Sequence, residues 1–421
     1  MTSQGRDAGG MRIVYIHQYY CNPTMTGGIR SYEQARRLVA QGHTVHVITT
    51  DITPGKRSLG WRRTDDDGIQ VHWFSVPYSN NMSFARRLRA FAEFMVLAAA
   101  KATALKADLV FATSTPLTVA VPGVIAAKLR RTPFVFEVRD LWPEVPIEMG
   151  VLRNPLARRL AGALANFAYR NAEEVIALSP GMAAGVTARR PGTRTTVIPN
   201  AADLALFDVA PDAVQRFRDE HRWLGDRPLI VYTGALGAVN GVEYLVRAAR
   251  KMGETDPDAQ VLIVGHGKEW DDTLALAREY GLLDRTVHMW EKVPKADLPV
   301  ILGAATMSSS FVRPIRGLWD NSANKFFDAL AASRPIAINY GGWQADLLRE
   351  SGAGLVLDPE NTDDAAGQLV RHLRDELWLK RAREAAHRLA VEQFSRDLLF
   401  ARFEEVLNRS AGRRPVLTEQ V

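Results

Sequence analysis

The chain has 421 residues, of which 47% are hydrophobic and 24% are charged, as in an ordinary globular protein. Lysine plus arginine (53) exceed aspartate plus glutamate (47), which gives a formal net charge of +6. This modest excess suits an anionic ligand or an acidic membrane surface. The sequence has no zinc spacing, recognition-helix signature or basic–aromatic ribbon, so we expect no nucleic-acid partner.

Cys21 is the only cysteine, which excludes an intrachain disulfide and suits a reducing compartment. The first ten residues are polar and do not resemble a secretion signal. The most apolar run, residues 91–100, contains Glu93 and is shorter than the roughly 20 residues that a membrane-spanning helix needs. These features predict a cytoplasmic protein.

The first half of the chain predicts a parallel sheet. Residues 11–16 (MRIVYI) predict a strand, a Pro/Gly-rich loop follows, residues 29–41 have a helical pattern, and residues 43–50 (HTVHVITT) predict a second strand. Short connections of this kind indicate strand–helix–strand units. Further strands are expected at 108–112, 133–137 and 174–178.

The winding restarts after residues 197–203 (VIPNAAD), where proline and asparagine interrupt any regular element. Continuous apolar runs then predict buried strands covered by helices on both faces. The expected strands are 228–234, 260–267, 286–292, 305–310, 335–341 and 354–359. One long helix is expected at about 377–407.

This pattern predicts an α/β protein built from two Rossmann-like, doubly wound parallel-sheet domains that face each other across a cleft. In such sheets, ligands bind at the carboxyl ends of the strands. The expected parts are a flexible tail at 1–10, an N-terminal Rossmann-like domain at 11–198, a C-terminal Rossmann-like domain at 199–385, a C-terminal helix at 386–409 that packs back on the N-terminal domain, and a flexible tail at 410–421.

Gly27 and Gly28 precede the first predicted helix. Glycines allow the backbone to approach a phosphate, and a helix N-terminus presents free N–H groups to it. The pair can equally serve only to make a tight turn. Gly234 and Gly265 each follow a predicted strand of the second half, where glycine marks the close approach of a ligand or of a packed helix.

The segment 320–330 (DNSANKFFDAL) is the most informative stretch of the chain. Asn321 or Ser322 is a suitable N-cap for the helix that follows. Asn324, Lys325 and Asp328 can share one helix face. There, the carboxylate can accept two hydrogen bonds from a ribose diol and the lysine can neutralise a diphosphate. The alternative is a surface ion pair between Lys325 and Asp328.

Two other segments have both a functional and a structural interpretation. Arg139 and Asp140 (in FEVRDLWPE) follow a predicted strand and can be a functional pair or a structural salt bridge. Residues 83–101 carry arginines ahead of an apolar run with Phe91, Phe94 and Met95. This helix can lie on an anionic membrane or pack against the sheet of the first domain.

The nine histidines include no His-x-x-x-His pair, and a single cysteine offers no cluster of thiolates. We therefore expect no bound metal and no cofactor.

Taken together, the motifs resemble the retaining glycosyltransferases of family 4, which have the GT-B fold. The resemblance extends from Met11 to about Leu407. It rests on the order of HQYYCNPTMTGGIRSYEQARRLVAQGHTVHVIT, FEVRDLWPE, IALSPGM, VIPNAAD, VYTGALGAVNGVEYL, LIVGHGKE and NSANKFFDALAASRPI. The branch that builds bacterial O-antigens, exopolysaccharides and glycolipids is the most similar.

The resemblance implies a nucleoside-diphosphate sugar donor, usually a UDP-sugar, held by the second domain. The acceptor is then a hydroxyl of a sugar, a lipid-linked glycan or a small molecule, held by the first domain. Transfer would retain the anomeric configuration and would depend on charge stabilisation of the departing diphosphate. Donor-binding residues are then expected to be Gly27, Gly28, Gly234, Gly265, Arg313, Arg316, Asn321, Ser322, Asn324, Lys325 and Asp328.

Three departures from the family pattern set the remaining expectations. The two glutamates spaced eight apart in the family correspond to Asp320 and Asp328, of which Asp320 would contact the transferred sugar. The acceptor-side His–Asp pair corresponds to Arg139–Asp140. The Arg and Lys that hold the diphosphate correspond to Ala235 and Asn240.

A cation from elsewhere must therefore face the diphosphate. We expect Lys325 to do so, assisted by Arg313 or Arg316, and count Asp320, Asp140, Arg139 and Lys325 as catalytic. A sugar-nucleotide 2-epimerase of the same architecture, and a nucleotide-sugar binding subunit without activity, are the alternative functions.

Overall fold

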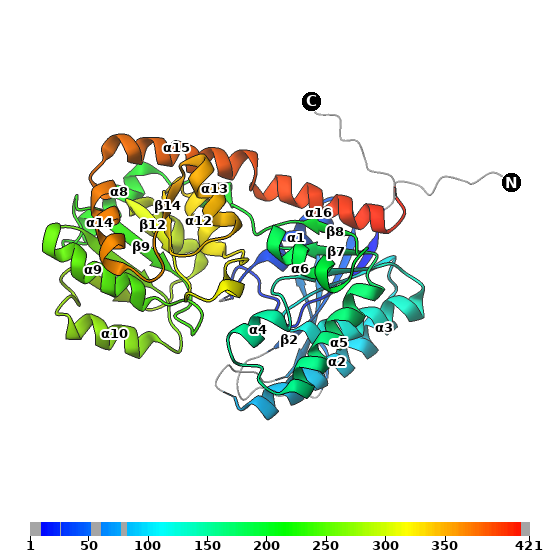
Figure 1. Ribbon diagram of the computed structural model, residues 1–421. Coiled ribbons are helices and arrows are strands. Elements are labelled where there is room, and N and C mark those ends of the chain that lie inside the picture. The colour runs from blue at the N-terminus through cyan, green and yellow to red at the C-terminus, as the bar shows by residue number, and fades with distance from the viewer. Residues whose placement is uncertain (1–9, 26, 52–59, 77–81, 414–421) are drawn as a thin grey trace. The chain divides into compact units, whose positions relative to one another are not determined.

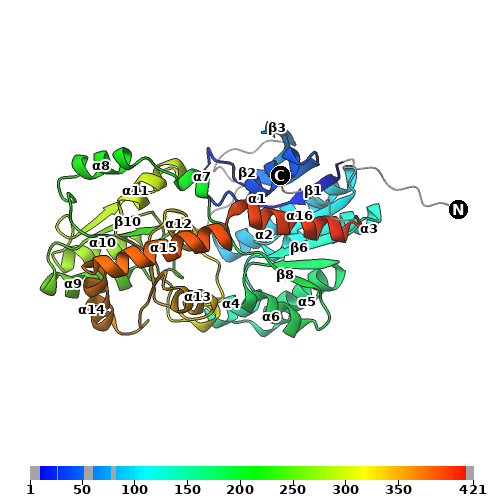
Figure 2. The same cartoon turned by 90° about the horizontal axis from the view of Figure 1, so that it is seen from above.

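The computed structural model describes residues 10–25, 27–51, 60–76 and 82–413. The chain divides into two compact units (Figures 1 and 2). The N-terminal unit comprises Met1–Ile198 together with Phe400–Val421, and the C-terminal unit comprises Pro199–Leu399. The boundary between the two units, at Ile198 and Pro199, therefore lies within the VIPNAAD segment.

The N-terminal unit is built on an eight-stranded sheet in the order β3-β4-β2-β1-β5-β6-β7-β8. All neighbouring strands are parallel except β3, which pairs antiparallel with β4. The strands are β1 (Arg12–Ile16), β2 (Thr44–Asp51), β3 (Arg62–Asp66), β4 (Ile69–Ser75), β5 (Leu109–Thr113), β6 (Phe134–Val138), β7 (Glu174–Ala177) and β8 (Thr195–Val197). The helices are α1 (Arg30–Ala40), α2 (Phe84–Ala104), α3 (Ala120–Arg130), α4 (Glu144–Glu148), α5 (Pro155–Asn171), α6 (Pro180–Arg189) and, from Phe400 onward, α16 (Arg396–Ser410).

Helices cover both faces of this sheet, because alternate strand residues point to opposite sides. Val110 packs with the buried side of α2, α3 and α5, which lie side by side in Figure 1. The next residue, Phe111, points the other way and meets Phe403 of α16, with ring centroids 5.2 Å apart. The C-terminal helix is also held by Arg409, which hydrogen-bonds the buried Glu174 at 2.7 Å.

The C-terminal unit has a six-stranded sheet in the order β11-β10-β9-β12-β13-β14, and all of its pairs are parallel. The strands are β9 (Leu229–Thr233), β10 (Gln260–Val264), β11 (Val287–Trp290), β12 (Met307–Ser310), β13 (Ile336–Ile338) and β14 (Gly354–Val356). The helices are α7 (Leu204–Phe207), α8 (Pro211–Glu220), α9 (Glu243–Thr255), α10 (Trp270–Glu279), α11 (Leu298–Ala304), α12 (Asn324–Ala331), α13 (Trp343–Ser351), α14 (Thr362–Leu373) and α15 (Glu376–Glu392).

Each sheet reverses its strand order once, and this point is where doubly wound sheets bind ligands. In the N-terminal unit, the reversal lies between β1 and β5, and in the C-terminal unit it lies between β9 and β12. The residues that follow these strands are therefore the first candidates for a site.

The structure differs from the sequence prediction at three elements. The antiparallel β3–β4 pair and the short β8 were not expected. The helix expected at 377–407 is broken into α15 and α16, because the backbone between them hydrogen-bonds to Ala202 at Phe394 and Arg396 and cannot continue the helical pattern there. Residues 386–399, expected to accompany the C-terminal helix, lie in the C-terminal unit.

Candidate active site

In the C-terminal unit, the loops after β9 and β10 contact each other directly. A Cβ on Gly265 would lie 1.8 Å from the carbonyl oxygen of Gly234, so only glycine fits there. Gly234 has φ +134, a conformation that favours glycine, and a Cβ on it would lie 3.2 Å from Cε of Lys325. Gly265 is therefore required for the packing of the two strand-end loops against each other. Gly234, which has no side chain, allows a cationic side chain to lie over its backbone.

Lys325, in the first turn of α12, is that cation. Its ammonium donates a hydrogen bond to the Tyr232 hydroxyl at 2.7 Å and lies 4.1 Å from the centre of the Tyr232 ring. The same hydroxyl donates to the carbonyl of Ala235 at 2.8 Å. Lys325 is thus fixed beside the backbone of Ala235, one of the two positions where the family's usual cation is missing. Burial lowers the pKa of Lys325 to about 7.

Asp328, one turn along α12, is only 7% exposed. Its Oδ2 lies 2.5 Å from Nζ of Lys295, whose ammonium also lies 5.2 Å from the centre of the Phe207 ring. The surface ion pair between Lys325 and Asp328, considered as an alternative, is therefore not formed. The two side chains have separate partners, and Lys295 is a second cation in this region that was not predicted from the sequence.

The two expected helper arginines are placed differently from Lys325. Arg313 donates to Glu269 at 2.6 Å and lies 3.5 Å from Glu243, so its charge is balanced by carboxylates of its own unit. Arg316 is exposed and its guanidinium lies 4.5 Å from the centre of the Trp319 ring. Neither arginine is hydrogen-bonded to the Lys325–Tyr232 pair.

The loop before α12 corrects the expected cap. The N-cap of α12 is Ala323, which makes no side-chain cap bond. Asn321 instead accepts a hydrogen bond from the Ala323 N–H at 3.0 Å. Ser322 is buried and accepts from the backbone N–H of Asn200 at 3.0 Å, which ties the loop to the VIPNAAD segment. Asp320 is half-buried in the same loop.

Asn324 does not share the environment of Lys325 and Asp328. It is exposed at the first position of α12, whereas Asp328 is buried. The expectation that these three polar groups form one cluster is therefore not met, because Lys325 and Asp328 turn toward different strand-end loops.

In the N-terminal unit, Arg139 lies beside a buried histidine at the end of β1. Arg139 donates from Nη1 to Nε2 of His17 at 3.3 Å, which leaves the Nδ1–H of His17 to donate to the Ser31 hydroxyl at 2.9 Å. Burial and the charge of Arg139 hold the pKa of His17 well below its usual value. His17 is therefore neutral at physiological pH.

The charge of Arg139 also acts on a buried ion pair that joins β6 to the first turn of α1. Arg30 hydrogen-bonds Glu137 at 2.8 Å, and their side chains are 7% and 0% exposed. Thr113 of β5 donates to the other carboxylate oxygen at 2.7 Å. Burial raises the pKa of Glu137, but the charges of Arg30 and Arg139 outweigh it and the pKa is lowered.

Three more residues complete the strand-end edge of this unit. Gly27 and Gly28 are exposed, directly ahead of α1, whose first turn has no side-chain cap, so its N–H groups are available to a ligand. Asp140 is exposed just after β6. Arg139 is not paired with Asp140 within salt-bridge distance in the described chain, so the structural salt bridge considered for this dipeptide does not form.

Gln18 follows His17 and was not singled out in the sequence. Its side chain is fully buried, and neither its amide nitrogen nor its oxygen has a hydrogen-bond partner. Buried polar groups are nearly always paired. The position directly after β1, at the reversal point of the sheet, was the available signal for both Gln18 and His17.

Both halves of the chain match known protein families. Residues 27–201 match the family described as a glycosyl transferase 4-like domain, and residues 227–375 match glycosyl transferases group 1. The chain therefore belongs to the group 1, family 4-like glycosyltransferases, and it has their GT-B fold class.

Individual relatives are distant. An alpha-D-kanosaminyltransferase of Streptomyces kanamyceticus is 26% identical over 42% of this chain and 44% of its own length. A GDP-mannose-dependent phosphatidylinositol monomannoside mannosyltransferase of Mycolicibacterium smegmatis is 26% identical over 61% of this chain and 73% of its own. The crystal structure of HepE from Anabaena with UDP and glucose is similar with a TM-score of 0.70 and 18% identity, over 95% of this chain and 100% of that one.

Two features are absent from the part of the chain that the structure describes. Among the described residues, no helix is both long and apolar enough to cross a membrane. Within the same residues, no group of three or more His, Cys, Asp or Glu side chains is placed to hold a metal ion.

Proposed function

We propose that this protein transfers a sugar from a nucleoside-diphosphate sugar, expected to be a UDP-sugar, to a hydroxyl acceptor, with retention of the anomeric configuration. The acceptor would belong to bacterial glycan, glycolipid or related glycoside biosynthesis. The observation that carries this proposal is the position of Lys325. Its ammonium lies over Gly234 and beside Ala235, where the strand order of the C-terminal sheet reverses.

The chemistry follows from that position. When the glycosidic bond of the donor breaks, negative charge develops on the leaving diphosphate. A preorganised cation at a strand-end glycine stabilises that charge more in the transition state than in the ground state. Asp328 can offer its second oxygen, Oδ1, to a ribose diol, while the contact of Lys295 with Oδ2 orients the carboxylate.

We propose that the acceptor binds at the strand-end edge of the N-terminal unit. Gln18 has a buried amide without a hydrogen-bond partner, which can bind a hydroxyl group, whereas both ring nitrogens of His17 are engaged by Arg139 and Ser31. Arg139 and Asp140 lie after β6, which is separated from β1 by β5. We propose Asp140 as a contact to the acceptor and Arg139 as a residue that positions His17, because its guanidinium donates to that ring.

The test is an assay of the purified chain with UDP- and GDP-sugars and a panel of sugar, glycolipid and aminocyclitol acceptors. Both nucleotides are included because HepE was solved with UDP and the mycobacterial relative is named for GDP-mannose. We expect transfer with a product whose anomeric proton coupling in NMR matches that of the donor.

Two control reactions separate this proposal from the alternatives. Conversion of the nucleotide sugar without any acceptor would indicate an epimerase. Tight donor binding without transfer to any acceptor would indicate a binding subunit. A product with the inverted anomer would show that the proposed stereochemistry is wrong.

We also propose a peripheral contact of α2 with an anionic membrane, in a revised form. Phe94 is 1% exposed and packs in the sheet core, so it cannot insert into lipid. The exposed side of α2 instead carries Leu88, Val96 and Arg89. Co-sedimentation with anionic vesicles should weaken with salt and in the Leu88→Ser/Val96→Ser variant. Binding that depends on neither lipid charge nor salt would contradict this contact.

A further inference from the structure

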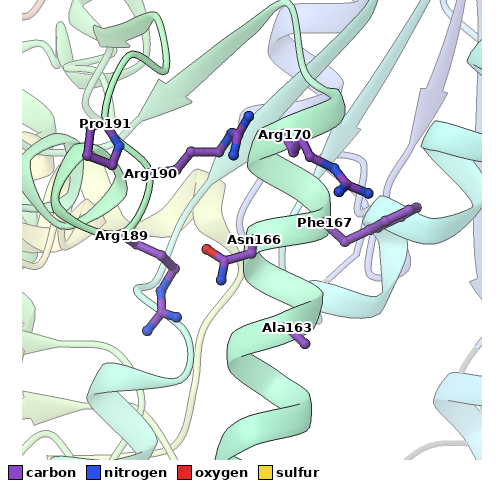
Figure 3. Close-up of a pocket in the computed structure, with 7 residues that line it drawn as sticks. All are labelled: Ala163, Asn166, Phe167, Arg170, Arg189, Arg190 and Pro191. Atoms are coloured by element: carbon purple, nitrogen blue, oxygen red, sulfur yellow. The ribbon is translucent and has the colours of Figure 1, made fainter.

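The N-terminal unit contains a second candidate site, a pocket of about 420 Å³ between α5 and α6 (Figure 3). It is separate from the strand-end edge. Arg170 lies in the last turn of α5, four residues before β7 begins at Glu174, and Arg189 is the last residue of α6, before β8. The pocket is therefore at the edge of the sheet where β7 and β8 begin, opposite the ends that form the candidate active site.

The lining is strongly cationic. Three of the seven lining residues are arginines and none is a carboxylate; the lining is Ala163, Asn166, Phe167, Arg170, Arg189, Arg190 and Pro191. Figure 3 shows the arginines reaching this region from two elements, Arg170 from α5 and the other two from the end of α6. Such a volume lies within the range of small-molecule sites, which is roughly 300–1,000 Å³.

One of the three arginines has a structural partner. Arg189 donates to Glu144 from Nε at 3.1 Å, and it can lie across α5 because Gly162 has no side chain there; a Cβ on Gly162 would be 3.1 Å from Nη1 of Arg189. Arg189 therefore joins α4, α5 and α6 and forms a fixed wall of the pocket.

The other two arginines have no such role. Within the described residues, the guanidinium groups of Arg170 and Arg190 make neither a hydrogen bond nor an ion pair, and both residues are exposed. A cation in the last turn of a helix is stabilised by the helix dipole, which accounts for one arginine at each helix end. Those two arginines are Arg170 and Arg189; the dipole does not account for Arg190, the C-cap residue of α6, whose unpaired guanidinium lines the same pocket beside the exposed amide of Asn166.

We propose that this pocket binds a phosphate group carried by an organic ligand. Guanidinium forks match phosphate oxygens in geometry and charge, and the Asn166 amide can donate to the same group. The half-buried ring of Phe167 and the ring of Pro191 supply an apolar wall for the organic part. The phosphate can come from a soluble sugar phosphate or from a lipid headgroup, since Leu160 is exposed on the same helix. The proposal does not depend on the transferase function.

Calorimetric titration of the full chain with pyrophosphate tests the site. We expect Arg170→Gln and Arg190→Gln each to weaken binding about tenfold or more, the effect of losing a charge-assisted hydrogen bond. Arg159→Gln is the matched control, because this arginine of α5 is exposed but does not line the pocket. It should change the affinity less than about twofold.

A second variant separates this site from the proposed donor site. The titration should retain the same binding event in Lys325→Met, which removes the donor-site cation. If Lys325→Met abolishes all pyrophosphate binding, or if Arg159→Gln weakens it as much as Arg170→Gln does, the pocket is not a phosphate site. Circular dichroism and melting curves of each variant check that the fold is intact.

Two further probes identify the source of the phosphate. Glucose 1-phosphate represents a free phosphate ester, and phosphatidylglycerol vesicles, compared with phosphatidylcholine vesicles, represent a lipid headgroup. Binding of the first that is lost in Arg190→Gln assigns a soluble ligand, and binding of the second with the same loss assigns a headgroup. No binding of either probe, nor of pyrophosphate, would overturn the proposal.

Discussion

Lys325 combines a fixed position with an unusual charge state. Its ammonium is held by the Tyr232 hydroxyl, and within the described chain no carboxylate lies within ion-pair distance of it. An anion bound over Gly234 would therefore meet a cation whose charge is not already neutralised. Arg313 is the opposite case, since Glu269 and Glu243 balance its charge. Lys325 was expected to face the diphosphate together with Arg313 or Arg316. The structure favours Lys325 acting without either arginine.

The first prediction concerns this cation. Lys325→Met keeps the aliphatic contact with Gly234 but removes the charge, and should lower kcat by about 30- to 1,000-fold, the effect of losing roughly 2–4 kcal/mol of transition-state stabilisation. Lys325→Arg should recover part of the activity. Steady-state kinetics of both variants, with the exposed Lys292→Met as control, measures this. Near wild-type kcat and KM in Lys325→Met would place the diphosphate elsewhere, and Arg313→Ala and Arg316→Ala would then identify the cation.

The lowered pKa of Lys325 gives a second prediction, for pH. A lysine loses its charge as the pH rises through its pKa, and burial moves that pKa from 10.5 to about 7. For the donor, kcat/KM reports the free enzyme, so it should be level below about pH 7 and fall above it. In Lys325→Arg the fall should disappear, because a guanidinium stays charged. A wild-type profile that stays level up to about pH 9 would contradict this protonation state.

A third prediction concerns Asp328 and Lys295. If Asp328 holds the ribose, Asp328→Asn should raise the donor KM with little change in kcat, since a ribose contact is similar in the ground and transition states. Lys295→Met should also raise the donor KM, because it removes the 2.5 Å contact that Lys295 makes with Asp328.

A double-mutant cycle measures whether the two residues act together. The effect of Asp328→Asn/Lys295→Met on KM should be smaller than the product of the two single effects, because residues in direct contact are not additive. Independent, multiplicative effects would mean that Lys295 contacts the donor itself and does not act through Asp328.

At the scale of elements, the Arg30–Glu137 pair connects α1 to β6, and Thr113 extends the network to β5. Arg30→Met would leave the fully buried Glu137 without its main counter-charge, and this should destabilise the N-terminal unit by about 3–5 kcal/mol. The control is Arg12→Met, which breaks a pair with Asp108 whose side chains are 46% and 34% exposed and should cost less than about 1 kcal/mol.

Hydrogen exchange of the β1 and β6 amides measures this loss in the unit concerned. In the wild type, the stabilisation of the N-terminal unit by the Arg30–Glu137 pair should be present at neutral pH. It should diminish as the pH falls through the lowered pKa of Glu137, because the protonated carboxyl no longer attracts Arg30. Equal exchange rates in Arg30→Met and Arg12→Met would mean that the buried pair adds no stability.

The elements themselves show what the sequence could and could not predict. Continuous apolar runs predicted the buried parallel strands because the runs are short, rich in β-branched residues and bounded by glycine and proline. The β3–β4 hairpin was missed although Asp67-Gly68, both with positive φ, is a strong turn signal, because β3 (RRTDD) is polar on both faces and has no apolar residues to indicate a strand. The break before α16 could not be predicted, because it depends on hydrogen bonds to Ala202, nearly 200 residues away.

The same distinction applies to the candidate site. Lys325, Asp328 and Gly234 follow from local motifs and their spacing. Lys295 does not, because it comes from a different loop and reaches Asp328 only through the fold. The balance of the Arg313 charge by Glu269 likewise joins residues 44 positions apart. Which cation is free and which is paired is therefore a property of the folded unit.

For the whole molecule, the last prediction is that transfer needs no divalent metal. A metal in such reactions neutralises the diphosphate as a Lewis acid, and we propose that Lys325 takes this role, with Lys295 nearby on Asp328. The Asp-x-Asp spacing at Asp256 and Asp258 does not offer a metal site, since both carboxylates lie by Arg374. Activity should persist after dialysis against EDTA and should not rise with added Mg²⁺ or Mn²⁺. The informative comparison is with Lys325→Met: if a metal partly restores that variant but leaves the wild type unchanged, the ion is replacing the lost lysine charge. Complete loss of wild-type activity in EDTA, recovered with Mg²⁺ or Mn²⁺, would show instead that a bound ion supplies the charge and that Lys325 is at most its assistant.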